Sequence, residues 1–481
     1  MLLVSALTLL CAAAPVAQDP MTIAVDRLYV GNGEVMENAV VVLADGKIVS
    51  VAPGIAADGA THIEGATLTP GLVDGFSFMG VGGATLEESR EVTASMQLSH
   101  LADLDSPSFQ NALDLGVTSA YLSPDSLNVI GGIGAFVKTG GGTPANLFAD
   151  NAARVLNPRA GLKVTLGGDP SRGNYTPSGL RTTSFNARRP NTRMGTVWIV
   201  RRDFYRAQDY MKALEQGLPV YDADLEVLAS ALRGEIPIRV QARRSHDVET
   251  ALRLQKELGW PNMILEEATE SHALAKQLVE ANVSVVCGPA YDSLRRSVAT
   301  GPSSAELHAL ASPAQVCCED LHDHEDGHDH FTEETGAFEL NQFSLDMLFL
   351  LAPRYSSAYG FAAGRRTEGR GSTPAMPALL QAGGVNLSLG GAEAHDQALT
   401  ESSLIHQARS AVRWGMAPAD AIASITSRPA ELCGVGDQLG QIAVGFDADL
   451  VLWSGDPLAA DSKPLLVILD GAIVVDNRPQ E

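Results

Sequence analysis

The chain has 481 residues, and 45% of them are hydrophobic, which is enough apolar material for a large core spread over more than one structural unit. Its 57 acidic side chains against 34 basic ones give a formal net charge of -23. This charge repels phosphate backbones and anionic lipid headgroups, so we expect no nucleic acid partner and no binding to acidic membrane surfaces.

The first 17 residues have the pattern of a secretory signal peptide. An apolar run from Leu2 to Leu10 is followed by the small residues Ala12–Ala14. The run is too short to span a bilayer. No Lys or Arg precedes it, and Pro15 stands close to the expected cut after Ala17, so a retained anchor or a mis-assigned start is the alternative. We predict export to the periplasm or the extracellular space, and no stable membrane span.

Both ends of the chain are predicted to be rich in β-strands. From Met21 to Leu68, short runs of β-branched and apolar residues alternate with turns such as Gly31-Asn32-Gly33. The segment from Leu439 to Val475 repeats this pattern. We therefore predict one small composite β-sandwich domain, built from residues 21–68 and 436–478.

Between these ends, strands and helices alternate in the βαβα pattern of a parallel sheet with helical crossovers. One such helix is predicted from Asp247, as its N-cap, to Leu258, with Gly259 as its stop. We predict a TIM-type (β/α)8 barrel over residues 69–435, with an irregular insertion at about residues 291–382. The eight expected barrel strands are Leu72–Phe78, Val117–Leu122, Ala135–Lys138, Val164–Leu166, Ile236–Ala242, Met263–Leu265, Val283–Cys287 and Val385–Leu389.

Several motifs resemble those of a known family. The segment Thr69–Phe78, with the sequence TPGLVDGFSF, resembles the first barrel strand of the amidohydrolase superfamily, in particular its imidazolonepropionase-like branch. The most specific match is Thr426–Leu432 followed by Gly445–Trp453, the run that in this family closes the barrel and re-enters the β-domain. Further segments resemble strands five, six and eight of the family: Ile236–Ala242, Leu265–Glu270 and Leu387–Ala392.

The resemblance implies a divalent metal inside the barrel, but the residues at the metal positions differ. The family's His-x-His pair, whose imidazoles reach the same side of the strand, is replaced by Phe76 and Phe78. Gln241 stands at the strand-five His, Glu267 at the strand-six His, and Ala392 at the strand-eight Asp that serves as general base. Four of these five residues are poor ligands or none at all, so we predict that the site is degenerate.

Other polar residues follow strands five, six and eight, at the face where such barrels carry out chemistry. They would supply a displaced metal or acid–base site, and the plainer interpretation is that they are surface and helix-cap residues. This group consists of His246, His272, Glu393, His395 and Asp396. Arg243-Arg244 after strand five would bind a carboxylate or remain solvated.

The segment from Cys317 to His330 is the most unusual local feature. Thiols and imidazoles at short spacing capture Zn, Ni or Cu ions, while the plainer interpretation is a solvated acidic loop that binds such ions weakly. The candidate ligands are Cys317, Cys318, His322, His324, His328 and His330.

Three functional hypotheses follow. The leading one is an amidohydrolase-related pseudoenzyme with no metal cofactor in the barrel, which binds a ligand or pairs with an active amidohydrolase paralogue or a second copy of itself. The first rival is a working hydrolase acting on non-peptide C–N bonds of cyclic amides through a displaced metal. The second is binding of Zn or another divalent metal through the His-rich loop.

Overall fold

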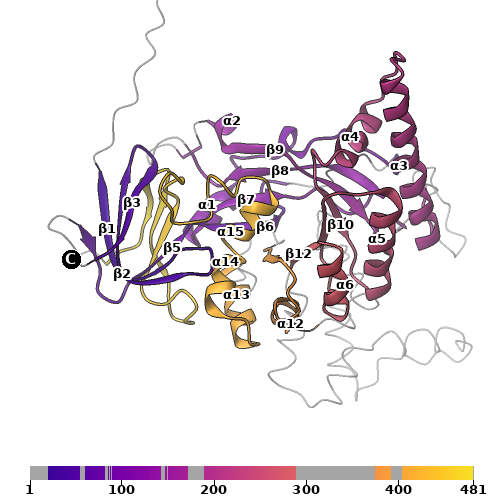
Figure 1. Cartoon of the computed structure of the whole chain (residues 1–481). Coiled ribbons are helices and arrows are strands. Elements are labelled where there is room, and N and C mark those ends of the chain that lie inside the picture. Colours follow the sequence, from indigo (N-terminus) through magenta and orange to yellow (C-terminus); the bar gives the residue numbers. More distant parts are fainter. Residues whose placement is uncertain are drawn as a thin grey trace, which may run out of the picture.

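The computed structural model describes residues 20–54, 60–81, 85, 87, 89–141, 147–148, 150–171, 189–288, 373, 375–391 and 404–479. These residues form two sheets, one at each side of the view in Figure 1. The larger part carries the helices, and the smaller part is a β-domain that contains both ends of the described chain.

The sheet of the β-domain combines strands from both ends of the chain, as predicted. Its order is β16-β15-β14-β5-β1-β2-β3, with β4 paired to β1. The ends join where β14 runs antiparallel to β5, so that Val451 lies opposite Thr69. The strands are β1 (Met21–Tyr29), β2 (Val35–Ala44), β3 (Lys47–Pro53), β4 (Thr61–His62), β5 (Thr67–Pro70), β14 (Leu450–Trp453), β15 (Pro464–Leu469) and β16 (Ala472–Asp476).

The second sheet is a nearly closed barrel whose strands follow one another in chain order, and all eight predicted strands are present. Its first and last strands come together so closely that a Cβ added at Gly75 would lie 2.8 Å from Ser388 Oγ. The strands are β6 (Leu72–Ser77), β7 (Val117–Leu122), β8 (Ile130–Lys138), β9 (Val155–Thr165), β10 (Ile238–Gln241), β11 (Met263–Glu266), β12 (Ser284–Cys287) and β13 (Leu387–Leu389).

The predicted parallel alternation is wrong for one strand. β8 runs antiparallel to both of its neighbours, with Tyr121 of β7 opposite Phe136 and Gly161 of β9 opposite Gly134. The connection between β7 and β8, residues 123–129, is too short to return the chain to the start of a parallel strand, which takes about a dozen residues or more. The barrel therefore has one reversed strand.

Helices surround this barrel. They are α1 (Pro107–Asp114), α2 (Asn151–Arg154), α3 (Arg193–Glu215), α4 (Ala223–Leu232), α5 (Ser245–Leu258), α6 (Ala275–Glu280), α12 (Met376–Ala382), α13 (Leu404–Arg413), α14 (Pro418–Ala423) and α15 (Ser427–Leu432). Short 3-10 turns lie at Leu98–His100, Asp169–Ser171 and Ser271–Leu274.

The start of α5 differs from its prediction, whereas its end is as expected. The helix begins at Ser245, so Asp247 lies in the first turn and is not the N-cap. Its carboxylate instead accepts hydrogen bonds from Arg193 of α3. Gly259 ends the helix in the left-handed conformation, with φ 73°, which a residue without a side chain adopts at little cost.

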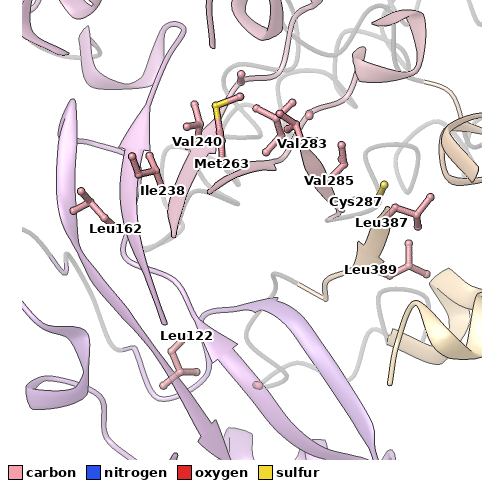
Figure 2. Packing of buried hydrophobic residues seen from close by; sticks show 14 of the residues in the cluster. Leu122, Leu162, Ile238, Val240, Met263, Val283, Val285, Cys287, Leu387 and Leu389 are labelled. Carbon is pink, nitrogen blue, oxygen red and sulfur yellow. The ribbon is translucent and has the colours of Figure 1, made fainter. Parts of the chain in front are cut away.

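Successive residues of the barrel strands face opposite sides. Ile238 and Val240 of β10 belong to the apolar cluster that also contains Val248 and Leu254 of α5, so they face the helices. Figure 2 shows this cluster along β9 to β13. Arg239 alternates with these two residues and faces the barrel interior, although it is also fully buried.

The reversed direction of β8 carries Lys138, at its end, to the β-domain. Its ammonium nitrogen lies 2.9 Å from an oxygen of Asp447, 3.1 Å from one of Asp449, and in contact with the carboxylate of Asp470. The side chain of Lys138 is only 6% exposed. One buried cation thus joins the barrel to three carboxylates of the β-domain.

We expect Lys138→Met to destabilise the protein by roughly 3–5 kcal/mol, because removing one partner leaves buried charges uncompensated. The matched control is Lys47→Met. Lys47 also contacts Asp447, but its side chain is 49% exposed, so we expect a loss of about 0–1 kcal/mol. Urea unfolding of both variants measures the two losses, and equal losses would contradict a role for burial.

The cluster also predicts a dependence of stability on pH. Burial, together with the nearby carboxylates, outweighs Lys138 and raises the pKa of Asp449 to about 6. Since this is above the unfolded value of about 3.9, the contribution of Asp449 to stability is fully present below about pH 4 and is lost as the pH rises through about 6. Relative to Asp449→Asn, the wild type should lose at most about 3 kcal/mol over this window. The free energy of unfolding of both proteins is measured from pH 4 to 7. A difference between them that stays the same across this range would refute the expectation.

Candidate functional site: the barrel interior

Two phenyl rings from β6 and the residue that follows it fill part of the barrel interior. Phe76 and Phe78 are 0% and 2% exposed, and their ring centroids lie 5.2 Å apart in an edge-to-face arrangement. They share a buried apolar cluster with Ile264 of β11 and Val286 of β12. Residues two apart on a strand face the same side, so β6 turns both rings inward, as the sequence predicts. An edge-to-face ring pair contributes a favourable interaction energy beyond the burial of its apolar surface.

A buried ion cluster lies next to the Phe76 ring. It consists of Lys163 of β9, Arg239 of β10 and Glu266 of β11. Lys163 Nζ lies 2.5 Å from Glu266 Oε2, and the Arg239 guanidinium donates to the other carboxylate oxygen. None of the three side chains is exposed. Burial alone would raise the pKa of Glu266, but the charges of Lys163 and Arg239 outweigh it and hold this pKa below its ordinary value. The carboxylate is therefore ionised between two cations.

Both cations also contact aromatic faces. Lys163 Nζ lies 4.7 Å from the centroid of the Phe76 ring, and Arg239 Cζ lies 3.5 Å from that of Tyr121. Arg239 Nη2 also donates to the carbonyl oxygen of Gly75 at 2.7 Å. The cations are thus held by a carboxylate, a carbonyl and two ring faces, which together offset part of their lost hydration.

A second polar layer lies at the carboxyl ends of the strands. Glu267 Oε2 accepts from Arg243 Nη2 at 2.6 Å and from Gln241 Nε2 at 3.0 Å. The same Gln241 nitrogen donates to Asp169 Oδ2 at 3.0 Å, and Arg243 Nη1 lies 2.8 Å from that oxygen. All four side chains are buried, so Arg243 is neither solvated nor open to a substrate carboxylate.

Glu267 has an unusual backbone conformation, with φ 52°. A residue with a branched or long side chain rarely adopts this left-handed region, and such strain gathers at functional sites. The conformation turns the chain after β11 so that Glu266 joins the lower ion cluster while Glu267 joins the upper layer.

These residues do not fit the divalent metal that the fold family implies. Phenyl rings have no lone pair to donate, and the amide oxygen of Gln241 is a weak ligand for a transition metal. Glu267 is already paired with Arg243. Within the described part of the chain, no group of three or more His, Cys, Asp or Glu side chains is arranged to hold a metal ion.

Of the histidines proposed for a displaced site, the structure describes His246 and His272. His246 is in the first turn of α5, half exposed, with Nε2 3.3 Å from Asp247 Oδ1. His272 is part of the turn Ser271–Leu274, where burial outweighs Glu270 and lowers its pKa. Outside the described residues lie Ala392, Glu393, His395 and Asp396, and with them Cys317, Cys318, His322, His324, His328 and His330.

The ion cluster of Lys163, Arg239 and Glu266 was not predicted from the sequence. One signal was available, since Lys163 and Arg239 each stand alone between apolar residues of a strand. In a barrel strand, a charged residue at such a position must face the interior, where it needs a partner. Their common partner comes from a third strand, and the sequence does not reveal that pairing.

Comparisons with known proteins agree with this fold. The family model described as the amidohydrolase family matches residues 305–477. Amidohydrolase tasK of Hapsidospora irregularis is 25% identical over an alignment of 442 residues that covers 86% of this chain. The chain spans only 37% of the length of that curated relative.

Solved structures extend the likeness to almost the whole chain. A crystal structure of an amidohydrolase from Thermotoga maritima MSB8 has a TM-score of 0.68 and 24% identity, covering 95% of this chain and 100% of that one. A second crystal structure, of an uncharacterized protein, has a TM-score of 0.50 and 18% identity, with 95% and 99% covered. The chain therefore has the fold of these solved structures, and its residues 305–477 match the amidohydrolase family model.

Proposed function

We propose that this barrel has lost the metal-dependent hydrolytic site of its family and that the protein acts by binding a ligand or a partner. The observation that carries the proposal is the content of the barrel interior. Two phenyl rings stand at the positions of the first metal ligands, and the ammonium of Lys163 lies against one of them.

Charge argues in the same direction. A divalent ion in the place of the Phe76 ring would lie about 5 Å from Lys163 Nζ, and Arg239 adds a second positive charge beyond Glu266. Repulsion between a doubly charged ion and one such cation is on the order of several kcal/mol at an effective dielectric constant of about 20. The single carboxylate of Glu266 is shared between both cations and offers little compensation.

The upper layer supports the same conclusion. A hydrolytic site needs an open metal position and a base that can accept a proton from water. Glu267 Oε2 already accepts hydrogen bonds from Arg243 and Gln241. Asp169 is similarly paired with Arg243. We therefore assign Glu267 and Asp169 a structural role and not that of a proton acceptor.

Export and pairing belong to the same proposal. Residues 1–17 lie outside the described residues, and no helix in the described part is long and apolar enough to cross a membrane. We propose that the mature chain begins near Gln18, works in the periplasm or outside the cell, and pairs with an active amidohydrolase paralogue or with a second copy of itself.

The proposal predicts that the metal content of the protein depends on the His-rich loop alone. Purified full-length protein and a variant that lacks residues 317–330 are analysed by elemental mass spectrometry. We expect the variant to hold no stoichiometric metal and to keep its melting temperature in the presence of a chelator. A stoichiometric Zn, Mn or Ni ion in the variant, with chelator-sensitive hydrolysis of a cyclic amide, would establish the displaced hydrolytic site instead.

The exchange of both rings for histidine tests the barrel itself. We expect Phe76→His with Phe78→His to cost several kcal/mol, because buried apolar groups give way to polar groups without a full set of partners. The control, Phe76→Leu with Phe78→Leu, keeps the apolar character and should cost less. Urea unfolding with and without Zn decides the matter, since a bound ion stabilises the folded state. Stabilisation of the histidine variant by Zn would show that the site still accepts a metal.

A further inference from the structure

Helices α3 and α5 lie side by side on the outer face of the barrel (Figure 1). Ion pairs join them at two places. Near one end, Arg193 Nε lies 3.0 Å from Asp247 Oδ1 and its Nη2 lies 3.1 Å from Oδ2. Near the other, Arg201 makes two bonds of 2.7 Å to Glu257. The two arginines are separated by about 12 Å along α3, since an α-helix rises about 1.5 Å per residue.

Between these two ion pairs is a cavity of about 360 Å³. Its apolar wall includes Leu166, which follows β9, Val197 of α3 and Leu254 of α5. Its polar lining includes Thr250 and Arg253 of α5. The volume falls within the range of about 300–1,000 Å³ that is usual for small-molecule sites.

Arg253 lines this cavity and has no carboxylate partner among the described residues. Its Nη2 donates to Thr250 Oγ1 at 2.8 Å, and the Thr250 hydroxyl donates to the carbonyl oxygen of His246 at 2.8 Å. No carboxylate among the described residues lies within ion-pair distance of Arg253, whereas Arg193 and Arg201 are each paired with one. The guanidinium is therefore oriented by Thr250 but keeps further N–H donors for a ligand.

We propose that the cavity between α3 and α5 binds a small organic anion with one carboxylate group and a short apolar tail. The carboxylate accepts hydrogen bonds from Arg253, whose planar fork matches its two oxygens. The tail lies against Leu166, Val197 and Leu254. A single uncommitted cation favours a monoanion over a doubly charged group such as phosphate.

The site lies outside the ring of strands and uses none of the residues of the barrel interior. Its occupation is thus independent of whether the barrel hydrolyses a substrate. Leu166 and His246 follow the carboxyl ends of β9 and β10, so the cavity opens beside the barrel mouth. In a chain with a net charge of -23, a cavity with an unpaired arginine offers an organic acid a locally favourable place.

Isothermal titration of the full-length chain with hexanoate, hexan-1-ol and hexylamine tests the proposal, because the three probes share a tail and differ in charge. We expect saturable binding of hexanoate alone. Arg253→Gln should weaken it by about ten- to a hundred-fold, the loss of a charge-assisted hydrogen bond. The control Lys256→Gln removes one positive charge from an exposed position of the same helix and should leave the affinity unchanged.

Circular dichroism confirms that both variants fold. Absence of saturable hexanoate binding to the wild type would overturn the proposal, as would equal affinities of the wild type and Arg253→Gln. An equal loss in Lys256→Gln would attribute binding to net charge and not to the cavity. Acetate binding as tightly as hexanoate, or inorganic phosphate competing at the same concentration, would rule out the apolar tail contact or the preference for a monoanion.

Discussion

The buried carboxylate of Glu266, held between Lys163 and Arg239, is the interaction on which the rest of this barrel depends. Three neighbouring strands, β9, β10 and β11, each contribute one of its members, so their relative positions must be kept for the charges to be satisfied. A buried ion pair of this kind adds little net stability over an apolar substitute, but breaking it is expensive. We therefore expect the cluster to specify the arrangement of these strands more than to add net stability.

A second buried cation with carboxylate partners lies where the barrel meets the β-domain. Lys138 is nearly as buried as Lys163, and it faces three carboxylates, of which Asp449 is the most deeply buried. Burial of Asp449, together with the two neighbouring carboxylates, outweighs the attraction of Lys138 and raises the pKa of Asp449 to about 6. The antiparallel direction of β8 makes this junction possible, because a parallel strand would have carried the end of the strand to the opposite face of the barrel. The reversal of one strand thus connects the two domains.

The positions of the barrel strands were predictable because each is a run of residues buried on both sides, such as Met263–Leu265, bounded by turns. The direction of β8 was not, since a strand takes its direction from its neighbours and from the length of its connections. Resemblance to a family identified Phe76, Phe78, Gln241 and Glu267 as interior positions, and the structure brings the first two together and the last two into one hydrogen-bonded layer. The resemblance did not reveal that Arg243 is the cation of that layer.

The sequence by itself determined the two strand-rich ends and the order of the eight barrel strands, because these depend on residue type and on periodicity along the chain. The tertiary structure alone decided which charges meet. Lys163 finds Glu266, Arg253 is left beside a cavity while Arg193 and Arg201 are paired, and Asp247, a plausible helix cap, becomes the partner of an arginine from another helix. Electrostatic pairing depends on distances of a few ångströms between segments far apart in the chain, and these distances exist only once the strands and helices have packed.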